Sequence, residues 1–140
     1  MKFKTDIIID TNLLDKNPQG MILEFKISGI HDHRAWPSWE IKAYLEEEVD
    51  KHKPDAVLVN FLHYQYVAGN ELVNTILPCA IDLKEKSFRP CAIIAKGFTK
   101  KSIQSLLNAG MIQDVFNIVV LEDKVDALKH LKKELSTTKI

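Results

Sequence analysis

The feature of this sequence that most constrains its fold is the alternation of short, largely apolar runs with longer segments of helical pattern. Runs at residues 56–59, 91–95 and 115–121 have the length of buried strands, and each precedes a segment with apolar residues at helical spacing. Together with a strand at residues 21–28 they make three successive strand–helix–strand units, which predict right-handed crossovers and parallel pairing. We therefore expect an α/β fold around a mostly parallel sheet.

An antiparallel strand is expected at the N-terminus. Residues 3–10 hold the apolar core of a first strand, and residues 12–20 combine Asp, Asn, Pro and Gly, as turns do. Residues 21–28 alternate with the period of a half-buried strand, and Glu24 falls on the polar side of the count. The two strands are expected to form a hairpin, so the predicted order is β-β-α-β-α-β-α-β-α.

Four helices are predicted between and after the later strands. The first buries Ile41, Leu45 and Val49 along one stripe. The second spans residues 69–86 and is expected to kink at Pro78, because proline removes a backbone hydrogen bond inside a helix.

The last two helices are defined by their end signals. Thr99 is expected to cap the third helix, and Gly110 to end it in the left-handed conformation. The fourth is expected over residues 122–134, and the tail from residue 136 to residue 140 is expected to fray. Its inward positions are predicted to be Val125, Leu128 and Leu131.

Size and composition narrow the class of protein. A chain of 140 residues is most economically one domain, residues 1–140. Nineteen basic residues balance 19 acidic ones, so charge gives no reason to expect a nucleic acid or a membrane surface as partner. No apolar run approaches the ~20 residues of a membrane span. Cys79 and Cys91 fall in apolar segments, as buried free thiols of a reducing compartment do. We expect a cytoplasmic protein without a cofactor.

The best candidate for a functional site is the loop after the strand at residues 56–59. Open α/β sheets place their sites at the carboxyl ends of such strands. Residues 61–71 contain no Ser, Thr, Cys, Lys or Arg, so the loop has the composition of a contact surface and not of an active site. Tyrosine is a favoured interface anchor. The predicted partner-binding residues are His63, Tyr64, Tyr66, Val67, Ala68, Gly69 and Asn70.

Several local patterns resemble the STAS domains (sulfate transporter and anti-sigma-factor antagonist). They are Leu-Glu-Phe-Lys-Ile-Ser-Gly at residues 23–29, the core strand at 56–60, a helix ending in Gly-Met at 103–111, Phe-Asn-Ile-Val at 116–119 and Asp-Ala-Leu at 126–128. The resemblance covers roughly residues 21–131. It implies a STAS-like fold and a regulatory role through a protein partner, such as a kinase-like or anti-sigma-like protein.

One departure from the family limits what the resemblance implies. In regulated members, a partner kinase phosphorylates a Ser or Thr in the loop after the core strand, and the added charge dissolves the complex. Two alignments place either Val67 and Ala68 or Gly69 and Asn70 at that site. No Ser or Thr occurs between residues 55 and 74. The resemblance therefore implies a member that has lost the phosphorylation switch.

Two enzyme-like or metal-binding patterns are weaker. The segment Ile-Ile-Ile-Asp-Thr-Asn at residues 7–12 resembles the start of PIN-type ribonucleases, whose Asp helps to hold a divalent metal. PIN domains continue with a helix there, whereas this sequence predicts a turn and a strand. The further carboxylates would be Glu40 or Glu46, Asp82, Asp114 and Asp123. The pattern His31-Asp32-His33, with His63 nearby, favours a solvated loop over a zinc site, which needs closed tetrahedral ligation.

The function favoured by the sequence is a non-catalytic regulatory module that binds a regulatory protein or a second copy of itself. The first alternative is a module for a small anion or lipid headgroup at the helix N-terminus near Gly69, where free N–H groups carry partial positive charge. The second alternative is the PIN-like metal-dependent ribonuclease.

Overall fold

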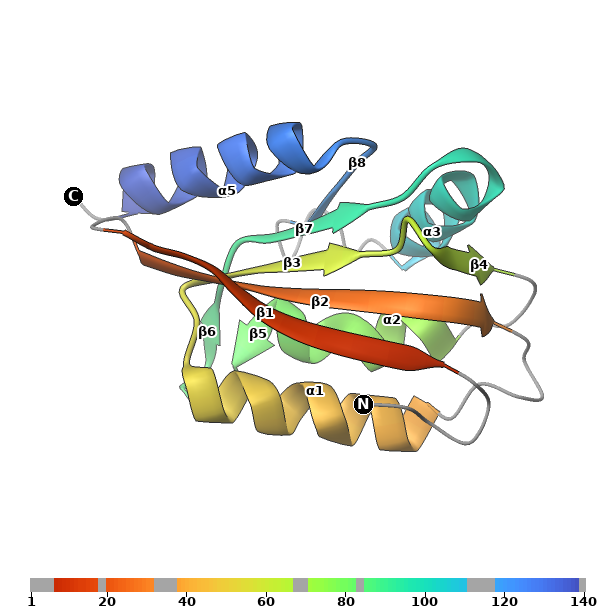
Figure 1. The fold of residues 1–140 in the computed structure, drawn as a ribbon, viewed down its shortest axis with the longest axis horizontal. Helices are drawn as coiled ribbons and strands as arrows, with labels where there is room; N and C mark the ends of the chain where they lie inside the picture. Colours follow the sequence, from red (N-terminus) through yellow and green to blue (C-terminus); the bar gives the residue numbers. More distant parts are fainter. Residues whose placement is uncertain are drawn as a thin grey trace.

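A central sheet organises the chain (Figure 1). The computed structural model describes residues 7–17, 20–31, 38–66, 71–82, 85–110 and 118–138. In these residues the sheet has six strands in the order β1-β2-β3-β7-β8, and β4 also pairs with β2. The strands of this sheet are β1 (Ile8–Asn17), β2 (Gly20–His31), β3 (Ala56–Asn60), β4 (Tyr64–Tyr66), β7 (Cys91–Ile94) and β8 (Ile118–Leu121). The helices are α1 (Ser38–His52), α2 (Glu71–Ile76), the 3₁₀ turn η1 (Leu77–Cys79), α3 (Gly97–Ala109) and α5 (Lys124–Thr138).

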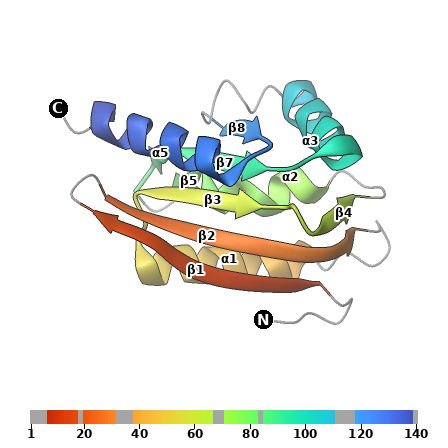
Figure 2. The same ribbon diagram turned by 45° about the horizontal axis from the view of Figure 1, so that its top comes forward.

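The strand directions confirm the predicted fold class. β1 is antiparallel to β2, and β2, β3, β7 and β8 are parallel to one another. β4 is also parallel to β2. The carboxyl ends of the parallel strands therefore lie along one side of the sheet, where α1, α2 and α3 begin (Figures 1 and 2). This side, with the first turns of the helices that leave it, is called the carboxyl edge below.

The two faces of the sheet are covered unequally (Figure 2). Helices α1, α2 and α3 pack on one face, where their apolar residues join those of the strands in the larger core cluster. Helix α5 covers the other face and packs over β3, β7 and β8. The smaller cluster there is formed by Ile22, Ala56, Leu58, Ala92, Ile94, Ala127, Leu131 and Leu135. Parts of β1 and β2 on the α5 face consequently remain exposed, including Ile8 and Ile30.

The stripe predicted for α1 is confirmed. Ile41, Leu45 and Val49 are buried against the sheet, as their spacing of four residues requires. Tyr44 is partly buried beside them and shares a hydrogen bond of 2.7 Å with Thr11 of β1. The first helix is thus positioned by both apolar contacts and a polar contact to the edge strand.

The predicted hairpin is present, but its first strand is longer than expected. The segment from Asn12 to Asn17 belongs to β1 and is not a turn. Asn12 pairs with Glu24, and Asn17 pairs with Gly20, with an irregularity between Leu13 and Asp15. Residues typical of turns lie in a strand here because pairing with β2 satisfies their backbone hydrogen-bonding groups. Local propensity does not predict this pairing.

The prediction of one long helix over residues 69–86 is wrong. Helix α2 ends at Ile76, and Pro78 lies in the 3₁₀ turn that follows instead of kinking a continuous helix. A short pair of strands, β5 (Ile81–Asp82) and β6 (Ser87–Phe88), follows the 3₁₀ turn. Proline cannot donate a backbone hydrogen bond, and here the chain leaves the helix at that point.

The predicted end signals of the last two helices also need correction. Helix α3 begins at Gly97, so Thr99 lies inside it, buried, with its hydroxyl donating to the carbonyl of Tyr64 at 3.4 Å. Gly110 has φ −88°, which is right-handed and not left-handed. In α5, Leu131 is buried as predicted, whereas Val125 is exposed. The helix continues to Thr138, beyond its predicted end at residue 134, while 139 and 140 lie outside the described residues.

Candidate functional site

The structure divides the predicted partner-binding loop into parts with different roles. His63 is exposed in the turn after β3, and its carbonyl accepts the N–H of Gly29 at 3.1 Å. Tyr66 ends β4 and pairs with His31 of β2. The predicted contacts Val67, Ala68, Gly69 and Asn70 lie outside the described residues. The loop therefore starts as an ordered turn and an extra parallel strand, where the sequence predicted an irregular segment.

Tyr64 needs a correction as a partner contact. Its side chain is 5% exposed and belongs to the larger core cluster, and its ring centroid lies 4.7 Å from that of Phe61. Such a pair buries a large apolar area against the sheet. Tyr64 consequently holds β4 in place and does not present its ring to a partner.

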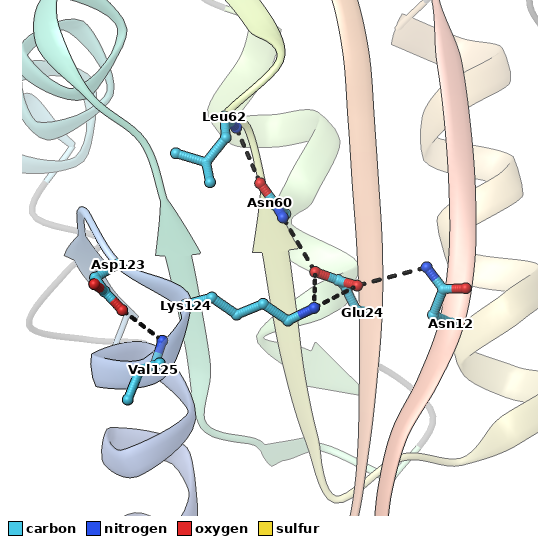
Figure 3. A network of polar contacts seen from close by, with 7 residues as sticks. All are labelled: Asn12, Glu24, Asn60, Leu62, Asp123, Lys124 and Val125. Carbon is cyan, nitrogen blue, oxygen red and sulfur yellow. Dashed lines mark hydrogen bonds and ion pairs between the residues drawn. The ribbon is translucent and has the colours of Figure 1, made fainter.

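A buried carboxylate lies within β2 on the α5 face of the sheet, beside the end of β3 (Figure 3). Glu24 of β2 is 2% exposed, although the strand pattern placed it on the polar side. Asn60 Nδ2 donates to its Oε2 at 3.2 Å, and Asn12 Nδ2 donates to its Oε1 at 3.5 Å. Lys124 Nζ lies 3.4 Å from each carboxylate oxygen. A buried charge is tolerated when it is paired and hydrogen-bonded, and Glu24 has both kinds of partner.

Asn60 connects this carboxylate to the predicted loop. It is the last residue of β3, and its side chain is 6% exposed. While Nδ2 donates to Glu24, Oδ1 accepts the N–H of Leu62 at 3.0 Å. The turn is closed by the N–H of Tyr64, which donates to the carbonyl of Phe61 at 3.1 Å. Both ends of the Asn60 amide are therefore used, one inside the sheet and one in the turn.

Lys124 is held at the edge by the start of α5. Asp123 Oδ1 accepts the N–H of Val125 at 2.7 Å and that of Asp126 at 3.4 Å, which caps the helix. This cap makes Lys124 the first helical residue and directs its ammonium group toward Glu24 (Figure 3). The Lys124 side chain is 42% exposed, so the network reaches solvent at this point.

Exposed apolar side chains concentrate at the same edge. Among the described residues, the large exposed apolar side chains include Phe98 at 68% exposed and Trp39 at 87% exposed. Each is the second residue of a helix that begins at the carboxyl edge. The others at this edge are Ile8, Ile30, Leu62 and Val125, whereas Leu13 and Phe88 lie elsewhere. The edge therefore combines a buried polar network with exposed apolar side chains from separate elements.

The sites predicted from the sequence patterns did not include Glu24, Asn60 or Lys124. The signal for Lys124 was available, because a lysine directly after a capping Asp stands at the positively charged end of a helix. Nothing in the sequence indicated that Lys124 would reach Glu24. That contact depends on which helix packs over which face of the sheet.

The weaker patterns do not assemble into sites in the described part of the chain. Within it, no group of three His, Cys, Asp or Glu side chains could hold a metal ion. Asp10 lies in β1, which continues as a strand where a PIN domain has a helix. Asp82 lies in the β5–β6 pair, far from the carboxyl edge (Figure 1), and Asp114 lies outside the described residues. His31 ends β2, while Asp32 and His33 are not described. No helix in the described ranges is long and apolar enough to cross a membrane.

The charged residues that line a hollow opposite the carboxyl edge make structural contacts. It is lined in part by Asp55, Asp82 and Arg89. Arg89 is 9% exposed; its Nη1 donates to the carbonyl of Pro78 at 2.8 Å, and its Nη2 lies 3.5 Å from Asp82. Asp55 accepts the N–H of Met21 at 2.8 Å. These charged groups hold the β5–β6 segment and the start of β2 in place.

The chain was compared with known protein families, curated sequences and solved structures. No protein-family model matches the chain, and no curated protein matches its sequence. Among solved structures, it is similar to an anti-sigma factor antagonist from Mycobacterium paratuberculosis, with a TM-score of 0.55 and 11% identity over 94% of this chain and 99% of that chain. The chain has a STAS-like fold. It is also similar to an uncharacterised protein of the DUF3478 family with a SpoIIAA-like fold from Shewanella loihica, with a TM-score of 0.53 and 19% identity over 89% of this chain and 93% of that one.

In this STAS-like domain, the carboxyl edge is the candidate functional site. The fold resemblance inferred from sequence is confirmed, and the predicted loop begins at this edge. The loop contains no Ser or Thr between residues 55 and 74. The edge of this STAS-like domain holds the Glu24 network beneath the turn and several exposed apolar side chains.

Proposed function

We propose that this STAS-like chain is a non-catalytic regulatory module that binds a protein partner through its carboxyl edge. The observation that carries the proposal is the concentration there of exposed apolar side chains from separate elements, namely Ile8, Ile30, Trp39, Leu62, Phe98 and Val125. Scattered exposed apolar residues are ordinary, but several at one edge are typical of interaction surfaces. The partner is a regulatory protein or a second copy of the chain.

The chemistry of the edge supports binding more than catalysis. Phe98 and Trp39 offer large apolar area, and aromatic residues supply much of the binding energy at protein interfaces. Lys96 and Lys101 are exposed near Phe98, and Asp123 is exposed near Val125, so charges of both signs border the apolar groups. A polar rim around apolar anchors is the usual composition of an interface.

The proposed module is not switched by phosphorylation of a Ser or Thr in the loop after β3. The sequence has no hydroxyl of either type between residues 55 and 74. The anion-binding alternative loses support because α2 has only six residues, which makes its dipole small. The ribonuclease alternative loses support because β1 continues as a strand beyond Asp10.

A matched pair of phenylalanine variants tests the proposal. Phe98 at the carboxyl edge is 68% exposed, and Phe88 in β6 is 58% exposed away from it. Phe98→Asp and Phe88→Asp make the same chemical change at two exposed sites. Wild-type chain and both variants would be immobilised and used to capture proteins from native lysate, with identification by mass spectrometry. Sedimentation velocity of each purified chain would measure self-association.

We expect wild type and Phe88→Asp to retain the same partner or the same self-association, and Phe98→Asp to lose it. A charge placed in an apolar contact is left without a partner and destabilises the complex. Equal behaviour of all three chains in both measurements would contradict the proposal. A loss shared by the two variants would show that the effect does not depend on the carboxyl edge.

A further inference from the structure

Two residues in this structure each break a local rule, and they compensate for one another. Glu24 is an acidic residue that is 2% exposed in the middle of a sheet. Lys124 is a cation in the first turn of α5, where the helix dipole is unfavourable to positive charge. Their ion pair, with Nζ 3.4 Å from both carboxylate oxygens, neutralises the buried acid and offsets the dipole.

The hydrogen bonds of Glu24 continue through Asn60 to the turn after β3. Glu24 accepts a hydrogen bond from Asn60, and this fixes the orientation of the Asn60 amide. With Nδ2 directed at Glu24, Oδ1 is directed at the N–H of Leu62. Chains of hydrogen bonds of this kind polarise and orient one another. A continuous series of polar contacts therefore runs from Lys124 on α5 to the turn that carries Leu62 and His63 (Figure 3).

We propose that Lys124 is a positioning residue whose charge holds the turn after β3 in its binding geometry. Without the ammonium group, the buried Glu24 carboxylate keeps only the amide donors of Asn12 and Asn60, and it would recruit water in place of Lys124. That rearrangement reorients Asn60 and weakens its contact with Leu62. The α5 helix and the carboxyl edge are thereby coupled, so any event that neutralises or displaces Lys124 changes the surface that binds the partner. This consequence for binding rests on the proposed function.

Three lysine variants test the coupling without a partner. Lys124→Gln removes the charge, Lys124→Arg keeps it, and Lys129→Gln removes a charge at an exposed site on the same helix. Amide hydrogen exchange measured by NMR would compare the N–H of Leu62 with that of Leu107, which is buried in α3. Exchange through local opening reports the local contact, whereas a uniform change reports global stability.

Lys124→Gln is expected to raise the exchange rate of the Leu62 amide at least about tenfold relative to Leu107, because hydrogen bonds involving charged groups are the stronger ones. Lys124→Arg and Lys129→Gln should leave that ratio within about twofold of wild type. If Leu62 and Leu107 change in parallel in Lys124→Gln, the role of Lys124 is only structural and the proposal is overturned. A loss in Lys124→Arg as large as in Lys124→Gln would overturn the assignment to charge.

A second arm connects the coupling to binding. The partner or self-association found with wild-type chain would be measured again with Lys124→Gln and Lys124→Arg. Weakened binding in the first and retained binding in the second are expected. Unchanged binding despite faster Leu62 exchange would refute control of the edge by Lys124. Should wild-type chain bind nothing, the proposed function fails, while the exchange ratio still decides whether Lys124 positions the turn.

Discussion

Asn60 donates its side-chain amide to the buried carboxylate of Glu24 across 3.2 Å, and this contact joins the end of β3 to the middle of β2. Both side chains are almost fully buried on the face of the sheet that α5 covers. A polar pair in this position stabilises the fold only when each group is satisfied. The turn after β3 and helix α5 must therefore keep the hydrogen-bond and ion-pair partners of this pair in place.

Asn60→Ala should destabilise the protein. The change leaves the N–H of Leu62 without its acceptor and removes a donor from Glu24, and a buried group that loses its partner costs roughly 1–3 kcal/mol. Urea unfolding followed by circular dichroism would measure the free energy of unfolding. Asn108→Ala, at an exposed position of α3, is the control and should change it by less than about 0.5 kcal/mol. Equal midpoints for Asn60→Ala and wild type would contradict the importance of the network.

Gly20→Ala should be costly at the start of β2. Gly20 has φ +142°, and a Cβ there would lie 2.7 Å from Asp55 Oδ2 and 2.9 Å from Asp55 Cβ. We expect a loss of roughly 2–4 kcal/mol from backbone strain and overlap. Gly97→Ala is the comparison, because φ is +58° but no atom lies within 4 Å of the added Cβ. Its cost should be about 1 kcal/mol. Thermal unfolding would measure the stability loss of both variants. A larger loss in Gly97→Ala than in Gly20→Ala would contradict the prediction.

Leu131→Ala and Val125→Ala should differ sharply although both change α5. Leu131 is fully buried between α5 and the sheet, so its truncation should cost roughly 2–5 kcal/mol. Val125 is 60% exposed, so its truncation should change stability by less than about 0.5 kcal/mol. Chemical denaturation gives both values. A similar large cost for the two variants would mean that Val125 is packed inward, as the sequence pattern suggested.

Stability should fall at alkaline pH through the buried thiols. Burial raises the pKa of Cys91 from an ordinary 9.0 to about 12, with Arg89 partly opposing the shift, and it raises the pKa of Cys79 as well. In the window from pH 9 to about 12 the unfolded chain loses thiol protons that the folded chain keeps, so stability is full below this window and falls as pH rises through it.

The contribution of one thiol can be isolated by substitution. The urea midpoint of wild type would be compared at about pH 8 and about pH 10 with that of Cys91→Ala. The decrease between the two pH values should be smaller in Cys91→Ala, because one of the two raised thiols is gone. A decrease of the same size in both chains would show that Cys91 does not contribute to the alkaline loss.

The sequence by itself determined the α/β class, the mostly parallel sheet, its N-terminal antiparallel strand and the apolar stripe of α1. These features follow from the periods of apolar residues, since a strand buried on both faces is a short apolar run and a helix covering one face repeats every three to four residues. The resemblance to STAS domains depended on the same patterns, and the fold confirms it.

Only the tertiary structure decided the details of the candidate site. The sequence pattern placed Glu24 on the polar side of its strand and Val125 on the inward face of its helix, yet Glu24 is buried against Lys124 of α5 and Val125 is exposed. Likewise, the turn-rich end of β1 and the residues from Tyr64 to Tyr66 became strands because β2 supplied partners for their backbone groups. The physical reason is that burial and strand pairing depend on which distant segment lies alongside, and the local sequence does not contain that information.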